Sequence, residues 1–207
     1  MHLPPPACRP PKTHSDRTRT KPGLGSILTA LMLLALLPGC QHTYEETRND
    51  SSKPRQQLDS SAIAYVSIPP DAKLRKGFAE NSGKVTANAV REEFARYFKR
   101  VYVGRRIETF EEGLASARSY QWSYFIYPFI LRWEDRATET SGRRDLLELQ
   151  MRVVDTATGE VLDTTVLKGR SRWMNDGGDT PADLIAEPAK DYAASFFNPM
   201  ATPSALR

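Results

Sequence analysis

Leu147-Glu148-Leu149-Gln150-Met151-Arg152-Val153 alternates apolar and polar side chains without a break. Successive side chains of a β-strand point to opposite faces, so this alternation predicts a strand buried on one face only. Thr156-Ala157-Thr158-Gly159 is a turn sequence, and Val161 to Trp173 is predicted to return as the antiparallel partner. This hairpin decides the fold class, because the remaining elements must pack around it.

Three segments upstream of the hairpin also have the character of strands. Ala62 to Ile68 is almost continuously apolar and ends at a Pro-Pro pair, which predicts a strand buried on both faces. Val101 to Val103 is a brief second strand. Tyr124 to Trp133 is a strongly apolar third strand, in which Pro128 predicts a bulge or an unpaired amide.

Helices are predicted between and after these strands. Ser82 is the expected N-cap of a helix that reaches about Arg100. Thr109-Phe110-Glu111-Glu112 is a capping box that opens a second helix. Thr180 caps a last helix, which Pro188 is expected to kink or split. Apolar side chains at four-residue spacing mark the buried face of the first helix: Val90, Phe94 and Phe98.

The predicted order of elements is β-α-β-α-β-β-β-α. This order is typical of a single α/β domain of the α+β kind, here over residues 61–197, in which helices pack on a mixed sheet. The last three strands form an antiparallel meander, and the helices can cover one face of the sheet. Residues 198–207 are expected to be a disordered tail.

A secretory leader precedes this domain. Residues 24–37 are about 14 uncharged, mostly apolar residues that follow Arg17, Arg19 and Lys21, which is the pattern of a signal peptide. The run is too short to cross a bilayer, which takes roughly 20 residues. Leu37-Pro38-Gly39-Cys40 resembles the lipobox of bacterial lipoproteins. That resemblance implies that residues 1–39 are removed and that Cys40 carries a diacylglycerol thioether and an amide-linked acyl chain such as palmitate.

The residues after Cys40 indicate where the anchor lies. Position 41 is Gln rather than the Asp that retains lipoproteins at the inner membrane of enteric bacteria, so the resemblance implies an outer-membrane protein that faces the periplasm. Residues 40–60 are polar and lack apolar periodicity. They are predicted to be the lipidated cysteine and a flexible tether that lifts the domain off the membrane.

Composition excludes several classes of function. The leader holds five of the 29 basic residues and one of the 25 acidic residues, so the rest of the chain has equal numbers of both signs. Net charge therefore gives no support for nucleic-acid binding. The histidines are His2, His14 and His42, all outside residues 61–197, which excludes Ser-His-Asp catalysis and the usual zinc sites from the domain. We predict no metal and no cofactor.

Three short segments follow the lipobox in a fixed order: Trp133 to Gly142, Val153 to Gly159, and Gly169 to Arg172. Over roughly residues 60–197 the chain resembles a family of uncharacterised Gram-negative lipoproteins, which implies a lipid anchor, one α/β domain and no assigned activity. The element order is also similar to that of the curli-secretion and penicillin-binding-protein-activator lipoproteins, and of the amino-terminal domain of the Tol-system periplasmic protein. Those are protein-interaction modules, and the analogy concerns the fold alone.

Charged side chains gather with an aromatic one between the third and fourth strands. Trp133 could serve as an aromatic platform beside carboxylates and guanidinium groups, and arginines on the returning strand could add bidentate donors. Such a surface suits a polar partner or a glycan strand. The alternative is a solvated hairpin whose charges pair with one another. The candidate binding residues are Trp133, Glu134, Arg136, Glu139, Arg170 and Arg172.

Basic residues also concentrate around the end of the first predicted helix. Cations near the carboxyl end of a helix are favourable on their own, and contact with lipid phosphates is the functional alternative. These residues are Arg91, Arg96, Lys99, Arg100, Arg105 and Arg106.

Three functions remain open at this point. The preferred hypothesis is a non-catalytic outer-membrane module that binds another envelope protein or the cell wall. The second is a lipid-anchored hydrolase in which Glu134 and Glu139 act as a carboxylate pair. The third is a periplasmic domain that binds a small ligand or a lipid.

Overall fold

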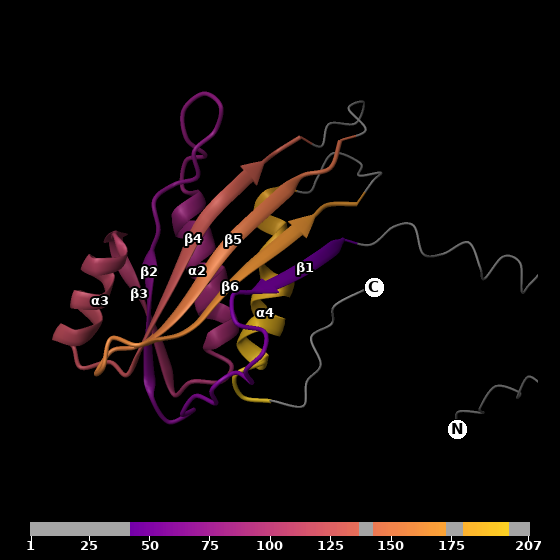
Figure 1. Cartoon of the computed structure of the whole chain (residues 1–207). Helices are drawn as coiled ribbons and strands as arrows, with labels where there is room; N and C mark the ends of the chain where they lie inside the picture. The colour runs from indigo at the N-terminus through magenta and orange to yellow at the C-terminus, as the bar shows by residue number, and fades with distance from the viewer. Residues whose placement is uncertain (1–41, 137–142, 173–179, 199–207) are drawn as a thin grey trace, which may run out of the picture. The chain divides into compact units, whose positions relative to one another are not determined.

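The described residues, which are 42–136, 143–172 and 180–198, form one mixed six-stranded sheet in the order β1-β6-β5-β4-β2-β3 (Figure 1). The structure is a computed structural model. Its strands are β1 (Thr43–Arg48), β2 (Ile63–Ile68), β3 (Arg100–Ile107), β4 (Tyr124–Glu134), β5 (Leu146–Asp155) and β6 (Val161–Arg170). Its helices are α2 (Ser82–Phe94), α3 (Phe110–Ser119), the 3₁₀ helix η1 (Pro181–Leu184) and α4 (Ala186–Ala194). The predicted fold class is confirmed.

The hairpin predicted from the alternating segment lies at the centre of this sheet. β5 pairs antiparallel with β4 on one side and with β6 on the other. Its apolar side chains Leu147, Leu149, Met151 and Val153 are all buried in the larger core, while the polar residues between them face the opposite side. The alternation therefore correctly predicted both the strand and its buried face.

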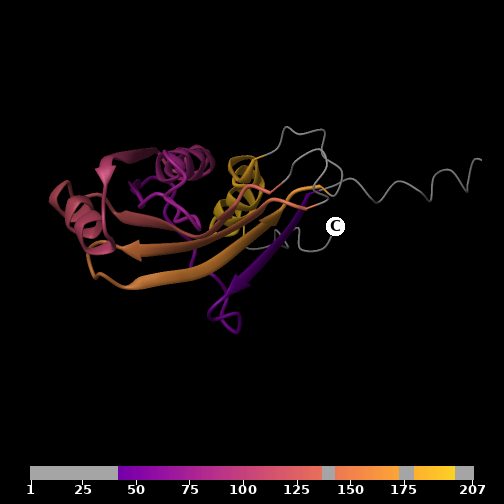
Figure 2. The ribbon, with the colours of Figure 1, turned by 90° about the horizontal axis from the view of Figure 1, so that it is seen from above.

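Helices pack on both faces of the sheet, which corrects the expectation that they cover one. β3 and β4 lie on opposite sides of β2 and both run parallel to it. Crossovers between parallel strands are right-handed, so two crossovers in opposite directions place their helices on opposite faces. α2 and α4 pack on the larger core and lie on one side of the sheet in Figure 2. α3 contributes Ala117 and Leu114 to a smaller cluster on the other face.

The stretch predicted to be a flexible tether contains an edge strand, so that prediction is wrong for Thr43–Arg48. β1 pairs antiparallel with β6, from Thr43 opposite Arg170 to Arg48 opposite Thr165. Its half-buried positions carry Tyr44, Glu46 and Arg48. Two of these three side chains are charged, so the strand has no apolar periodicity that sequence analysis could detect.

Two helix predictions need smaller corrections. α2 ends at Phe94 rather than near Arg100. The Arg96 and Tyr97 amides donate to the carbonyls three residues earlier, those of Glu93 and Phe94, and so tighten the chain into a turn that leads to β3. Its N-terminus is capped by a distant side chain, since the Asp71 carboxylate accepts from the Gly83 amide at 2.8 Å. The last helix is split as predicted, with Pro188 in the first turn of α4.

The bulge expected at Pro128 lies three residues further along β4. The register shifts between Ile130 and Arg132, which leaves Leu131 as the bulged residue. Pro128 itself lies beyond Ile126, the last β4 residue paired with β2. Among the described residues this half of β4 pairs with β5 alone, which is the edge-like setting in which a strand tolerates proline.

Gly83 is a position where we expect a single methyl group to destabilise the fold. A Cβ built there would lie 2.1 Å from the Pro69 carbonyl oxygen, and backbone cannot move aside as a flexible side chain can. Gly83→Ala should lower the free energy of unfolding in urea by about 1–3 kcal/mol. Lys84→Ala, one residue further along the exposed side of the same helix, is the control and should change it by less than about 0.5 kcal/mol.

Candidate binding site at one end of the sheet

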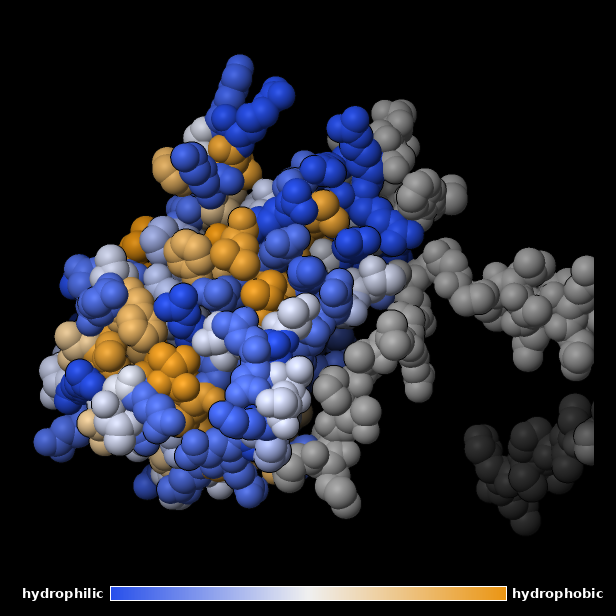
Figure 3. Space-filling model, viewed as in Figure 1, coloured by the Kyte–Doolittle hydropathy of each residue, from blue (hydrophilic) through white to orange (hydrophobic). Residues whose placement is uncertain are grey.

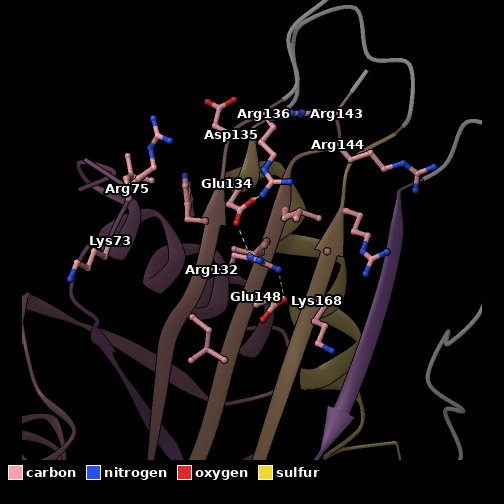
Figure 4. Close-up of a pocket in the computed structure, with 17 residues that line it drawn as sticks. Lys73, Arg75, Arg132, Glu134, Asp135, Arg136, Arg143, Arg144, Glu148 and Lys168 are labelled. Carbon is pink, nitrogen blue, oxygen red and sulfur yellow. Dashed lines mark hydrogen bonds and ion pairs between the residues drawn. The ribbon is translucent and has the colours of Figure 1, made fainter. Parts of the chain in front are cut away.

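An open cavity of about 1350 Å³ lies where β4 and β6 end and where β5 begins (Figure 4). The register places Glu134, Leu146, Arg170 and Thr43 side by side across four strands at this end. The loop between β2 and α2 adds Lys73, Leu74 and Arg75 to the lining. The antiparallel meander and the loop therefore bring together residues from four parts of the chain.

The structure places the predicted site residues unequally. Trp133, Glu134, Arg136 and Arg170 line the cavity. The side chain of Trp133 nevertheless packs against the larger core, on the side of β4 opposite Glu134, so little of its ring is free to act as an exposed platform. Arg172 is exposed and lies outside the cavity lining. Glu139 lies outside the described residues.

On the sheet face opposite α2 and α4, charged side chains of opposite sign alternate across the strands. We call this row the charge ladder. The Arg132 Nε lies 2.8 Å from Glu134 Oε1, and its Nη1 lies 3.3 Å from Glu148 Oε1 on β5. Figure 4 shows Arg132 between these two carboxylates. Lys168 on β6 continues the ladder to Glu45 on β1, at 3.6 Å. Many of the charges thus pair with one another, as the alternative interpretation of this region expects.

The cavity still has a clear excess of positive charge. Its lining holds eight arginine and lysine side chains against three carboxylates. Lys73 and Arg75 on the loop are exposed, and so is Arg170 at the end of β6. The arrangement is therefore suited to an anionic ligand or surface rather than to a cation.

Sequence reasoning missed the contribution of the loop. Lys73 and Phe78 form an isolated bridge, and the Leu74 amide donates to the Gly77 carbonyl at 3.0 Å. Gly77 has φ +77°, a left-handed conformation that glycine adopts without strain. A signal was present in the sequence, because cationic and apolar residues are mixed over Lys73–Phe78 around that glycine. Nothing in the sequence places this loop beside β4.

A second polar cluster is buried between β1, β6 and α4. The side chain of Asp163 is 1% exposed and forms ion pairs with Arg48 and Arg55, the latter at 3.4 Å. Its Oδ2 accepts from the Tyr192 hydroxyl at 2.9 Å and from the Thr165 hydroxyl at 2.7 Å. These contacts satisfy the carboxylate, so we assign the cluster to stability: it fixes the N-terminal strand to the rest of the domain.

A stack of aromatic rings lies at the opposite end of β4. The Trp122 ring centroid is 4.8 Å from Tyr65, 4.9 Å from Tyr102 and 4.6 Å from the exposed Tyr120. Gln121, between Tyr120 and Trp122, has φ 56° and turns the two neighbouring rings onto each other. This stack was also missed, because its members come from β2, β3 and the loop before β4.

Three tyrosines are expected to resist ionisation at alkaline pH. Burial and the Asp163 carboxylate raise the pKa of Tyr192, burial and a hydrogen bond to Glu108 raise the pKa of Tyr65, and burial raises the pKa of Tyr127. A pKa raised in the native state contributes stability that is complete below the unfolded value of about 10 and is lost as pH rises above it. Phenolate absorbance of the native protein should therefore show these three of its eight tyrosines ionising at higher pH than they do in the unfolded chain.

The denaturant-unfolded chain is the control for this titration, because all eight tyrosines should then ionise with the unperturbed pKa of about 10. Simultaneous ionisation of every tyrosine in the native protein would contradict the expectation.

The described ranges contain neither a metal-binding cluster nor a membrane-spanning helix. Residues 42–136, 143–172 and 180–198 contain no group of three or more His, Cys, Asp and Glu side chains placed to hold a metal ion. The same residues include no helix that is long and apolar enough to cross a membrane.

The fold and this site define a class: a single-domain α/β protein with a cation-rich cavity at one end of a mixed sheet. Residues 56–196 match the family described as a domain of unknown function, DUF4823, and the chain belongs to that family. The match agrees with the expected resemblance to a family that has no assigned activity. No curated protein sequence matches the chain.

Solved structures with a similar fold include two of PelC dodecamers from Paraburkholderia phytofirmans. The one in space group C2, a point variant, has a TM-score of 0.54 at 12% identity, covering 72% of this chain and 96% of that chain. The one in space group P6 has a TM-score of 0.53 at the same identity and coverage. Lipoprotein GNA1162 from Neisseria meningitidis gives 0.38 at 11% identity, covering 68% of this chain and 99% of that chain. At these identities the PelC likeness shows the fold alone.

Proposed function

We propose that this protein is an outer-membrane lipoprotein, anchored through acyl chains on Cys40, whose periplasmic domain binds another envelope protein or the cell wall without catalysing a reaction. The observation that carries the proposal is the open face of β4, β5, β6 and β1. Among the described residues α3 packs on this face only near Phe125 and Tyr127 of β4 and Val154 of β5. No helix packs over the remainder, although α2 and α4 cover the other face (Figures 1 and 2).

The open face has the chemistry of a protein-binding surface. Phe129 is 37% exposed and Leu131 is 47% exposed. Phe129 lies opposite Gln150, which lies opposite Val166, so apolar side chains of β4 and β6 flank Gln150. In the space-filling view, orange apolar groups lie among blue polar ones on this face (Figure 3). An apolar centre with a charged rim, here the ladder around Arg132, is typical of protein interfaces.

The PelC structures whose fold this domain shares are described as dodecamers. A second copy of this chain is therefore included among the envelope proteins that the open face could bind.

The anchor is tested first by following a clickable fatty acid into cells that express the wild type or Cys40→Ala. Label should be lost from the variant, and the wild type should fractionate with the outer membrane. Label that persists in Cys40→Ala, or wild type that is not in the membrane fraction, would contradict the anchor.

The binding face is tested by photo-crosslinking in cells. A photoreactive residue at position 129 should form adducts, whereas the same residue at position 85, also exposed but on α2, should not. Leu131→Glu should reduce the adducts from position 129 at least tenfold, because it places a charge in the apolar centre. Val85→Glu is the matched control. Equal adducts from positions 129 and 85 would contradict the assignment of the open face.

The two alternative functions are tested separately. For a hydrolase using Glu134 and Glu139, replacing both residues by Ala should abolish activity and preserve crosslinking. The Glu134 carboxylate is paired with both Arg132 and Arg136, which favours a role in charge pairing. For a ligand-binding domain, the cavity of about 1350 Å³ is the relevant feature, and native mass spectrometry of the purified protein should show an adduct.

A further inference from the structure

Very little chain separates the proposed anchor from the folded domain. β1 begins at Thr43, three residues after Cys40. Three residues span at most about 11 Å even when fully extended. If Cys40 carries acyl chains, as the proposed function holds, they lie in the bilayer beneath a headgroup layer roughly 5–8 Å thick. The Thr43 end of the sheet must then lie at the membrane surface, without a tether long enough to lift it.

This geometry brings one end of the sheet, with its side chains, to the membrane. The register puts Arg170 directly opposite Thr43, with Leu146 and Glu134 on the next two strands. The end of the domain nearest the anchor is thus the end that holds the cation-rich cavity. The loop between β2 and α2 projects past the sheet on the same side as the ends of β4 and β6 (Figure 1).

The loop combines exposed apolar and cationic side chains. Phe78 is 63% exposed, and Leu74 beside it is half-buried. Around these apolar side chains lie Lys73, Arg75 and Lys76, all exposed. An aromatic ring flanked by long cationic side chains fits the boundary between lipid headgroups and acyl chains, where the ring enters the apolar layer and the cations meet phosphates.

We propose that the Lys73–Phe78 loop, with Arg170 and the cation-rich cavity beside it, docks the domain onto anionic phospholipid headgroups of the leaflet that holds the Cys40 anchor. In the docked domain the end of the sheet lies against the membrane, so the open sheet face is directed sideways into the periplasm. The aromatic stack around Trp122 lies at the far end of β4, away from the membrane.

The basic residues near the end of α2 are a weaker candidate for the same role. Arg96 pairs with Glu93 at 2.7 Å, and Arg106 pairs with Glu112 at 3.4 Å. Arg100 donates to the Tyr102 hydroxyl and lies opposite Ile63 at the start of β2, the end of the sheet away from the Lys73–Phe78 loop. Arg91 also pairs with Glu92, at 3.2 Å, so four of the six cations in that group have partners within the protein.

The test uses the mature, lipidated protein in vesicles of phosphatidylcholine with phosphatidylglycerol. Cys8 is removed with the leader and Cys40 is acylated, so an engineered cysteine would be the only free thiol. A fluorescent label on Phe78→Cys, whose apolar fluorophore takes the place of the phenyl ring, should be quenched by brominated lipid. The same label on Thr158→Cys, in the exposed turn at the far end of the meander, should stay at least threefold less quenched.

Charge variants then test the recognition of anionic lipid. Each cation near an anionic surface strengthens attraction about fivefold, so the triple variant Lys73→Gln, Arg75→Gln, Lys76→Gln should lower quenching at position 78 to the level at position 158. Pure phosphatidylcholine should have the same effect in the unaltered protein. Flotation with the vesicles, measured first, reports the anchor separately: protein that fails to float overturns the proposed function and the docking that rests on it.

Three results with floating protein would overturn the docking itself. Equal quenching at positions 78 and 158 would show that this end does not face the bilayer. Quenching that is unchanged in phosphatidylcholine or in the triple variant would show that anionic headgroups are not recognised. Crosslinks in cells from position 75 to a protein, in place of lipid, would assign the loop to a protein partner.

Discussion

Asp163→Ala is expected to lower the free energy of unfolding by about 3–5 kcal/mol, because it leaves buried guanidinium groups without their carboxylate. The Arg55 side chain is 8% exposed and also pairs with Glu46. Tyr192 would lose its hydrogen-bond acceptor at the same time. Equilibrium unfolding in urea measures the effect, provided that m is unchanged between wild type and variant.

Two controls separate charge from shape in this experiment. Asp163→Asn keeps the size of the side chain and an acceptor for Tyr192. The loss of unfolding free energy in this variant therefore measures the effect of the negative charge alone. Lys190→Gln removes an exposed ion pair with Glu187 and should change stability by less than about 1 kcal/mol. A loss below about 1 kcal/mol for Asp163→Ala would show that the cluster does not hold β1 to the domain.

Phe94→Ala is the second substitution with a large expected effect, again about 3–5 kcal/mol of unfolding free energy. Phe94 is fully buried, and its ring lies 6.0 Å from Tyr192, 6.1 Å from Phe98 and 6.3 Å from Phe196. Removing the ring opens a cavity where α2 meets α4, and surrounding side chains refill such a space only in part. Urea unfolding measures the loss.

Phe78→Ala is the matched control for Phe94→Ala, since it removes the same ring from an exposed position. It should change the unfolding free energy by less than about 0.5 kcal/mol. The same variant should weaken docking to anionic vesicles, so one pair of substitutions separates packing from membrane contact. Similar stability losses for the two variants would contradict the packing assigned to Phe94.

One end of the sheet and its open face have distinct proposed roles. The end near Thr43 holds the cation-rich cavity and the proposed membrane contact. The opposite end holds the Trp122 stack and the turn at Thr158. Between them, the open face around Phe129 is the proposed partner surface. The crosslinking and quenching experiments test these two surfaces independently.

Local patterns in the sequence determined several elements by themselves. The alternation over Leu147–Val153 specified a strand and its buried face, because side-chain direction in a strand depends only on position along it. The capping box at Thr109–Glu112 is confirmed in every contact, since its partners are three residues apart. Pro188 split the last helix for an equally local reason.

Tertiary structure alone decided the rest. β1 is held by ion pairs such as Arg48 with Asp163, which are 115 residues apart, so neither partner marks the strand in the sequence. The placement of α2 and α3 on opposite faces follows from the positions of β3 and β4 around β2. The cavity likewise combines Lys73 with Arg170. Periodicity reports what lies within a few residues, whereas sheet order and ion pairing depend on which distant segments meet.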